Sequence, residues 1–217
     1  MSVADAADAL KTKLKSNADR YTESQRVRLH RAISWLDRSG AETSDHDAQF
    51  IFLWIAFNGA YAKEIGFDES ERGKLANFVG SLISIDNQKR LHGVLFQQFT
   101  GPIRTLLDNK FVFEPFWRAL RDHDSSNRWE DSFASSRKAA LGAIVAGDTA
   151  KVLGIVFDRL YVLRNQLVHG GATWNSKVNR TQLKDGTSIM MAITPIILDL
   201  MLDHPEMDFG EIMYPVL

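Results

Sequence analysis

Hydrophobic residues recur along most of the chain at intervals of three and four positions, and strict alternation of apolar and polar residues is hard to find. Side chains three and four positions apart share one face of an α-helix, so this period predicts amphipathic helices and an all-α fold. The most apolar segment, residues 48–66, is the best candidate for a central helix buried on several sides. The expected helices cover residues 4–16, 22–38, 48–66, 68–85, 91–99, 102–107, 115–121, 128–146, 149–169 and 178–202.

Capping side chains mark several of the expected helix ends. Thr22 and Gln25 form the pattern of a capping box, in which each side chain accepts a hydrogen bond from the backbone of the other residue. Asp45 or Asp47 is expected to cap the third helix, and Asp148 the helix that begins after it. These positions therefore predict where three helices begin.

The chain shows no internal repeat, low-complexity tract or clear linker. The polar stretch Arg121–Ser132 is the expected surface loop between two halves of the fold. Pro195 lies within the last expected helix and is expected to kink it. The length allows one large domain or two small ones, and a single domain over residues 1–217 is the preferred prediction.

Composition narrows the class of protein without naming a function. Of the 217 residues, 45% are hydrophobic and 24% are charged, as in ordinary globular proteins, and there is no cysteine for a disulfide or a thiolate metal site. The start of the chain has no signal-peptide core, and no apolar run reaches the roughly 20 residues of a membrane span, so we expect a cytoplasmic protein without a membrane partner. A net charge of −1 argues against non-specific coating of nucleic acid, although a local basic groove stays compatible with it.

The segment VLRNQLVHGG, Val162–Gly171, places polar and charged residues at the end of an apolar helix. Arg164 falls at offset 11 from Leu153, inside an apolar stripe. Arginine keeps its charge, so this end of the stripe is expected to meet a carboxylate, an anionic ligand or a groove open to water. Asn165 and His169 share a neighbouring face, and Gly170 is expected to end the helix. The stripe consists of Leu153, Val156, Phe157, Leu160, Leu163 and Leu167, at offsets 0, 3, 4, 7, 10 and 14.

Both charged residues also have a structural explanation. An ion pair with an acidic residue of another helix would account for Arg164. A favourable interaction between a cation and a helix C-terminus would account for His169. The spacing of the residues, taken alone, favours these two explanations.

The stretch RNQLVH, Arg164–His169, resembles the signature of the HEPN family (higher eukaryotes and prokaryotes nucleotide-binding), in which a polar residue follows an arginine and a histidine stands a few residues later. The apolar segment Phe50–Tyr61 is similar to the second core helix of such proteins, and His169–Gly186 resembles a bacterial subset of the family. The resemblance implies a HEPN-like helical bundle with a core at about residues 22–65 and 147–203. Residues 66–146 would then be inserted or elaborated helices.

The resemblance implies metal-independent cleavage of RNA by an endoribonuclease of the toxin or defence type. When a 2′-hydroxyl attacks the adjacent phosphate, one group must exchange its proton and another must stabilise the phosphoryl oxygens. His169 suits the first role and Arg164 the second, while Asn165 would orient His169 or the scissile phosphate. The resemblance also implies a homodimer in which two motifs form one composite site, and a nucleotidyltransferase-like antitoxin as a partner.

Three residues after the motif are candidates for binding RNA. Trp174, Asn175 and Arg180 follow it closely enough to line the same cleft, and Trp174 is able to stack on a base. A structural role for Trp174, covering the end of the helix, is an equally good explanation.

Other polar clusters have simpler explanations. The two Asp-His-Asp sequences, 45–47 and 122–124, are expected to be helix caps and loop residues, so we expect no metal site, and we expect no cofactor. The basic stretch RVRLHR, Arg26–Arg31, is expected to be a solvated helix face unless it neighbours His169, where it would contact phosphates.

A second class of function fits the same residues. A non-catalytic HEPN-like module would bind RNA, a nucleotide or a partner protein, because Arg164 and His169 are able to hold an anion without cleaving it. The sequence motifs of P-loop, serine hydrolase and Rossmann proteins do not occur. The residues that usually perform nucleotide hydrolysis and serine hydrolase chemistry are therefore missing from the sequence.

Overall fold

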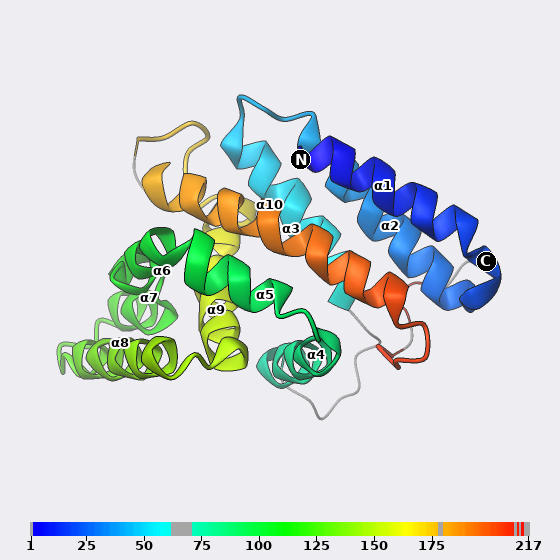
Figure 1. The fold of residues 1–217 in the computed structure, drawn as a ribbon. Coiled ribbons are helices and arrows are strands. Elements are labelled where there is room, and N and C mark those ends of the chain that lie inside the picture. The colour runs from blue at the N-terminus through cyan, green and yellow to red at the C-terminus, as the bar shows by residue number, and fades with distance from the viewer. Residues whose placement is uncertain (1, 62–70, 178–179, 211, 213, 215–217) are drawn as a thin grey trace. The chain divides into compact units, whose positions relative to one another are not determined.

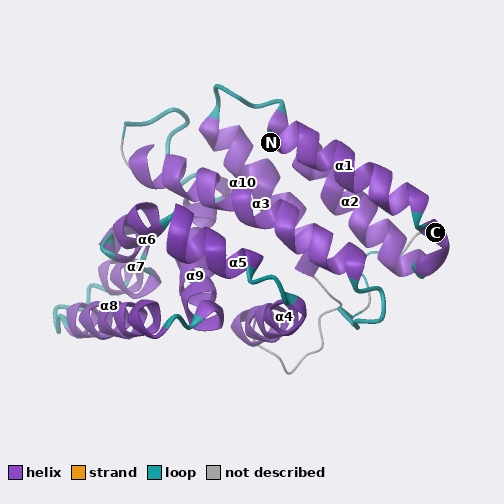
Figure 2. Ribbon diagram, viewed as in Figure 1, coloured by secondary structure: helices purple, strands orange, loops and turns teal. Residues whose placement is uncertain are grey.

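The computed structural model describes residues 2–61, 71–177, 180–210, 212 and 214. These residues form α-helices with short connections and no β-sheet (Figure 2), so the prediction of an all-α fold is confirmed. The helices are α1 (Val3–Ser16), α2 (Glu23–Gly40), α3 (His46–Tyr61), α4 (Glu71–Ile85), α5 (Arg90–Gly93), α6 (Thr100–Leu107), α7 (Glu114–Arg121), α8 (Arg128–Ala146), α9 (Thr149–Val168) and α10 (Arg180–Asp203), as labelled in Figure 1. Short 3-10 turns cover Ala18–Arg20 and Lys110–Val112, and a π-helical turn covers Val94–Gln98.

The chain divides into two compact units. The first unit contains Met1–Leu91 and Met190–Leu217, and the second contains His92–Ile189. The boundaries fall within α5 and α10, and they do not coincide with the limits 66 and 146 expected for inserted helices. The single domain over residues 1–217 stays a prediction.

Local capping signals placed the helix starts correctly. Thr22 and Gln25 form the expected capping box at the start of α2. Asp45, and not Asp47, caps α3: its Oδ1 accepts the backbone N–H of Asp47 and of Ala48, each at 3.0 Å. The carboxylate of Asp148 accepts the N–H of Lys151 at the start of α9.

Some expected helix ends differ from the observed ones. The third helix was expected to reach residue 66 and ends at Tyr61 in the described part of the chain; the expected start at Asp68 lies outside the described residues. The last helix begins at Arg180 and continues through Pro195 to Asp203. The expected first residues of that helix, 178 and 179, are also outside the described residues.

The core of the first unit lies where α2 packs on α3 and α1 packs on α2. Gly59 permits the close approach of α2 and α3, because a β-carbon at this position would lie 3.3 Å from the Cα atom of Ala32. The C-terminal part of α10 joins the same unit, where the Tyr21 hydroxyl donates a hydrogen bond to the Leu202 carbonyl at 2.9 Å. The largest buried side chains here include Leu29, Ile33, Leu36, Phe50, Leu53 and Phe57.

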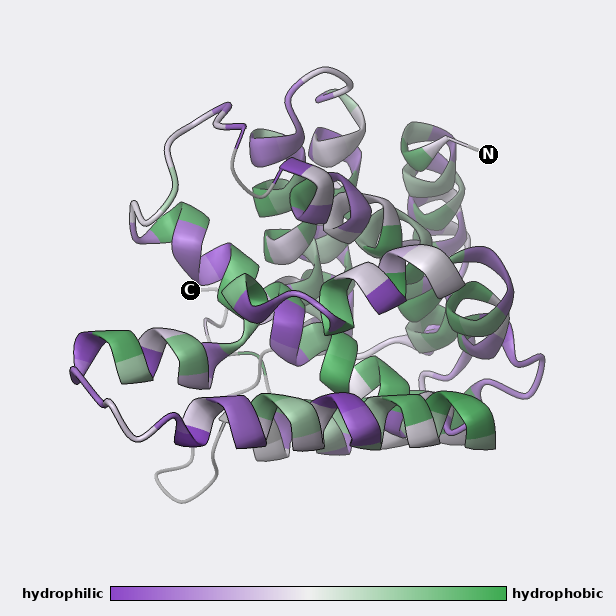
Figure 3. Cartoon of the chain, turned by 90° about the vertical axis from the view of Figure 1, so that its left-hand side faces the viewer, coloured by the Kyte–Doolittle hydropathy of each residue, from purple (hydrophilic) through white to green (hydrophobic). Residues whose placement is uncertain are grey.

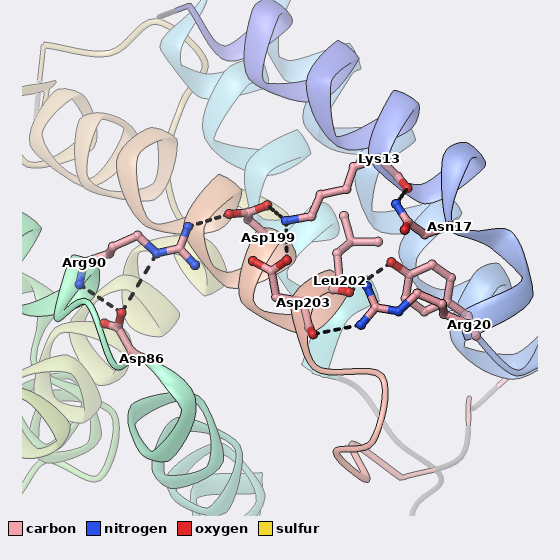
Figure 4. Close-up of polar contacts among 9 residues, drawn as sticks. Lys13, Asn17, Arg20, Asp86, Arg90, Asp199, Leu202 and Asp203 are labelled. Carbon is pink, nitrogen blue, oxygen red and sulfur yellow. Dashed lines mark hydrogen bonds and ion pairs between the residues drawn. The ribbon is translucent and has the colours of Figure 1, made fainter.

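An ion-pair network centred on Asp199 ties three helices of the first unit together (Figure 4). Asp199 on α10 pairs with Lys13 of α1 on one side and with Arg90 of α5 on the other, and Lys13 also pairs with Asp203 at 2.7 Å. Burial would raise the pKa of Asp199, but the hydrogen bonds from Lys13 and Arg90 outweigh it and lower this pKa from its ordinary value. The carboxylate of Asp86 fixes the start of α5 by accepting the backbone N–H of Arg90.

The second unit is organised around α9, which packs against α6, α8 and the Lys110–Val112 turn. Hydrophobic and hydrophilic residues follow one another along the helices of the chain (Figure 3), as amphipathic packing requires. The buried hydrophobic residues of this unit include Ile103, Leu106, Leu107, Val112, Val156, Phe157 and Leu160.

Among the described residues, α10 is the helix long and apolar enough to cross a membrane by length and composition. This differs from the expectation that no apolar segment reaches that length, because the few polar residues of α10 are outweighed by their apolar neighbours. Of its most apolar window, 61% is buried inside the protein.

Candidate functional site

The RNQLVH segment forms the C-terminal end of α9, as expected. The helix ends at Val168, and His169 caps it with its backbone N–H donated to the Asn165 carbonyl at 3.0 Å. Gly170 follows at a φ of +70°, a left-handed conformation that glycine adopts without strain. The Ala172 N–H then donates to the Gln166 carbonyl at 2.9 Å, which folds the following turn back onto the helix.

Arg164 lies at the exposed end of the apolar stripe. The preceding stripe residues, from Leu153 to Leu163, are buried, whereas Arg164 is half-buried, so its expected core position is only partly correct. Its Nη1 donates to the Asn165 Oδ1 atom at 2.8 Å. Its Nε atom is enclosed and has no hydrogen-bond partner within the described residues.

No carboxylate of the described residues pairs with Arg164. Arg164 therefore forms no interhelical ion pair among the described residues, which was the structural explanation for its position. The Arg164 guanidinium carbon lies 5.9 Å from the centre of the Tyr161 ring, within the range of a cation–π interaction. Within the described part of the chain, the positive charge of Arg164 at the helix end thus has no carboxylate partner.

The polar residues of the motif follow one another around the helix. With about 100° per residue, His169 lies roughly 40° from Asn165 and roughly 60° from Gln166 around the axis of α9. Arg164 lies about 140° from His169 on the same scale, but its side chain reaches back to Asn165. His169 itself is exposed. The order around the helix is therefore Arg164, Asn165, His169 and Gln166.

The Asn165 side chain contacts Arg164. Its amide oxygen accepts from the guanidinium and so orients it, while the roles expected for Asn165 toward His169 and the scissile phosphate stay predictions. The His169 ring is exposed, one helical turn after Asn165.

Gln166 connects the motif to a segment that the sequence did not single out. Its Nε2 atom donates to the Phe111 carbonyl at 2.6 Å, and the Trp117 indole N–H donates to the same carbonyl at 2.8 Å. The signal was available in principle, because a glutamine within an apolar helix requires a hydrogen-bond partner. Its partner was not predictable, because the Lys110–Val112 turn is distant in sequence.

The buried arginine of α9 is Arg159, which the sequence reasoning missed. It is 3% exposed, and its guanidinium carbon lies 4.4 Å from the centre of the Phe113 ring and 5.5 Å from that of Phe133. Its Nη2 atom also donates to the Ser136 hydroxyl at 3.3 Å. Arg159 and Gln166 stand seven residues apart, on one face of α9, and together they hold the segment around Phe111 and Phe113 on the helix.

The residues expected to bind RNA lie on the loop after the motif. The Trp174 side chain is 70% exposed, and Asn175 adopts a left-handed φ of 54°. Arg180 donates from Nε to the Ser176 carbonyl at 3.0 Å, so it is engaged with the loop backbone. Both roles expected for Trp174, stacking on a base and covering the helix end, stay predictions.

The basic stretch Arg26–Arg31 does not form a continuous patch. Arg28 is buried, and it donates to the carbonyls of Ala60, Phe209 and Gly210 at 3.0, 2.9 and 2.6 Å. The other basic residues line a groove of about 760 Å³ in the first unit, whose lining includes Lys11, Lys15, Arg26, His30 and Arg31. A second cavity of about 220 Å³ also lies in the first unit, and the motif lines neither of them.

The Asp-His-Asp sequences serve local structure. Asp45 caps α3, and Asp124 accepts the backbone N–H of Ser126 at 2.9 Å. In the described part of the chain, no three histidine or carboxylate side chains are grouped so as to hold a metal ion.

Comparison of the chain with models of protein families, with curated proteins and with solved structures found no match.

Proposed function

We propose that this protein is a metal-independent endoribonuclease of the toxin or defence type, with a site formed by Arg164, Asn165 and His169. The observation that carries the proposal is the pairing of Arg164 with Asn165 beside an exposed histidine at one helix end. The resemblance of RNQLVH to the HEPN signature supports the same chemistry. The loop residues Trp174, Asn175 and Arg180 would contact the RNA on the C-terminal side of the motif.

Each of the three side chains has its own role in the proposed reaction. Arg164, oriented by Asn165, presents its remaining N–H groups to the phosphoryl oxygens and stabilises their negative charge in the transition state. His169 takes the proton from the attacking 2′-hydroxyl, or returns a proton to the leaving 5′-oxygen, because imidazole exchanges protons near neutral pH. The 2′-oxygen bonds to phosphorus as the bond to the 5′-oxygen breaks. The products are a 2′,3′-cyclic phosphate and a 5′-hydroxyl.

A single copy of the motif offers one histidine, whereas the reaction uses both a base and an acid. A homodimer that brings two motifs together would supply the second proton-transfer group. In the proposed dimer, Val168, which is 49% exposed directly before His169, would lie in the interface. A nucleotidyltransferase-like antitoxin is the partner that would restrain such an enzyme.

One observation favours the alternative, a non-catalytic module that binds RNA, a nucleotide or a partner protein. The amide oxygen of Asn165 is engaged with Arg164, which leaves only its amide N–H groups to orient the imidazole of His169. An anion would still bind to Arg164 in that case.

Cleavage of a fluorescent RNA by the purified protein tests the proposal. We expect cleavage to persist in excess chelator, to leave a cyclic phosphate, and to disappear in His169→Ala with the fold intact. His30→Ala changes an exposed histidine of α2 in the first unit and serves as the matched control. Activity that requires a divalent metal, or full activity in His169→Ala, contradicts the ribonuclease assignment. Binding of RNA without cleavage supports the non-catalytic module.

A further inference from the structure

We propose that Phe111 and Lys110 form a base-stacking subsite that receives a nucleotide of single-stranded RNA beside the motif. The inference rests on the proposed function, since it names how the same site would hold its RNA. It also gives a role to the Lys110–Val112 turn, which lies in the region where the sequence shows no recognised motif.

The position of the turn follows from its hydrogen bonds to α9. The Gln166 amide binds the Phe111 carbonyl at 2.6 Å, and Gln166 and His169 are three residues apart on α9. Residues with this spacing are neighbours on a helix surface, separated by about 4.5 Å along the axis. The Phe111 backbone is therefore fixed beside the face that presents His169.

The backbone of Phe111 is held firmly, while its ring is presented to solvent. Asn109 Oδ1 accepts the Phe111 N–H at 2.8 Å, and the Phe111 carbonyl accepts from both Gln166 and Trp117. The Phe111 side chain is nevertheless 41% exposed. The edge of the aromatic cluster supports it from behind, with Phe116 at a centroid distance of 5.5 Å and an interplanar angle of 87°. The ring thus packs on this cluster with part of its surface left open to a ligand.

The positive charge of Lys110 beside the Phe111 ring favours an anionic ligand. The Lys110 ammonium lies 5.5, 5.2 and 5.7 Å from the ring centres of Phe111, Phe116 and Trp129, and no carboxylate of the described residues pairs with it. An uncompensated cation next to an exposed aromatic ring matches a ligand that carries both a flat π-surface and a negative charge. A nucleotide has both, because its base stacks on the ring and its phosphate attracts the lysine.

Binding of a fluorescein-labelled single-stranded RNA to His169→Ala protein tests the subsite without cleavage of the probe. We expect Phe111→Ala to weaken binding by about tenfold, the order of magnitude of one lost base stack. Phe111→Tyr, which keeps the ring, should bind like the parent. Lys110→Ala should lower the salt dependence of binding by about one phosphate contact. Val145→Ala, at an exposed apolar position on α8, is the matched control and should leave binding unchanged.

An RNA of the same length with abasic sites separates stacking from folding. If Phe111 stacks on a base, the difference between the parent and Phe111→Ala should shrink on the abasic RNA. An equal loss on both RNAs would mean that the ring acts only through the fold, and would overturn the subsite. Unchanged RNA binding by Phe111→Ala also overturns it and leaves the proposed function standing. Absence of RNA binding and cleavage in the unsubstituted protein defeats the proposed function, and the subsite with it.

Discussion

The guanidinium carbon of Arg159 lies 4.4 Å from the centre of the Phe113 ring. This contact fixes the segment before α7 on the face of α9 that also carries Gln166. Gln166 belongs to the motif. The packing of Arg159 on Phe113 therefore helps to hold the segment before α7 beside the candidate site. The second unit therefore combines a structural arginine, Arg159, with Arg164, which pairs with no carboxylate of the described residues, on the same helix.

Replacing Arg159 should destabilise the second unit. Arg159→Ala removes the contacts with Phe113 and Phe133 and opens a cavity, so we expect the free energy of unfolding to fall by about 2–4 kcal/mol. Lys151→Ala changes an exposed position of the same helix and should stay within about 0.5 kcal/mol of the parent. Urea unfolding followed by circular dichroism measures both variants. Equal stability of the two variants would contradict a structural role for Arg159.

Arg28 should prove structural despite its place in a basic stretch. Arg28→Ala would leave the buried carbonyl of Ala60, and those of Phe209 and Gly210, without this donor, so we expect a loss of about 3 kcal/mol or more. Arg26→Ala, at an exposed position of α2, should cost less than about 0.5 kcal/mol. Thermal unfolding of the two variants checks this. A loss of RNA binding in Arg28→Ala with unchanged stability would show that Arg28 acts on a ligand.

The Asp199 network predicts how stability depends on pH. The pKa of Asp199 is lowered in the folded protein, so its stabilisation is present above its ordinary value of 3.8 and is lost as the pH falls through the folded pKa. Asp199→Asn should lower the free energy of unfolding by about 1–2 kcal/mol at pH 7, and the difference should shrink as the pH falls below the ordinary value of 3.8. Asp8→Asn, in an exposed pair with Lys11, is the control and should change little. A constant difference between parent and Asp199→Asn from pH 7 to pH 3 would exclude this linkage.

The proposed homodimer makes a prediction for Val168. If this exposed side chain lies in a two-fold interface, Val168→Asp should give a monomer and lose cleavage, because the substitution places two carboxylates in an apolar contact. Arg164→Ala should abolish cleavage or RNA binding and leave the dimer intact or slightly more stable, since it removes a like-charge contact. Light scattering at micromolar concentration measures the assembly. A monomeric parent protein, or a Val168→Asp variant that stays dimeric, rules out an interface at this position.

The ends of the helices were largely predictable because capping is local. Thr22 with Gln25, and Asp148 with Lys151, satisfy backbone N–H groups within three residues. Gly170 follows the end of α9 in the left-handed conformation, which glycine adopts more easily than any other residue. Such signals need no knowledge of the rest of the chain.

The sequence by itself determined the all-α class, the apolar stripe of α9 and the position of the motif at a helix end, because helical periodicity and caps are properties of neighbouring residues. Tertiary structure alone decided which arginines are buried. Arg159 lies at the edge of the apolar stripe, about 40° around the helix from Leu163. It is buried because Phe113 and Phe133, from distant segments, cover that part of the helix. The pairing of Gln166 with Phe111 arose in the same way. Periodicity identifies the apolar face of a helix, but the burial of a polar face depends on which distant segment packs against it.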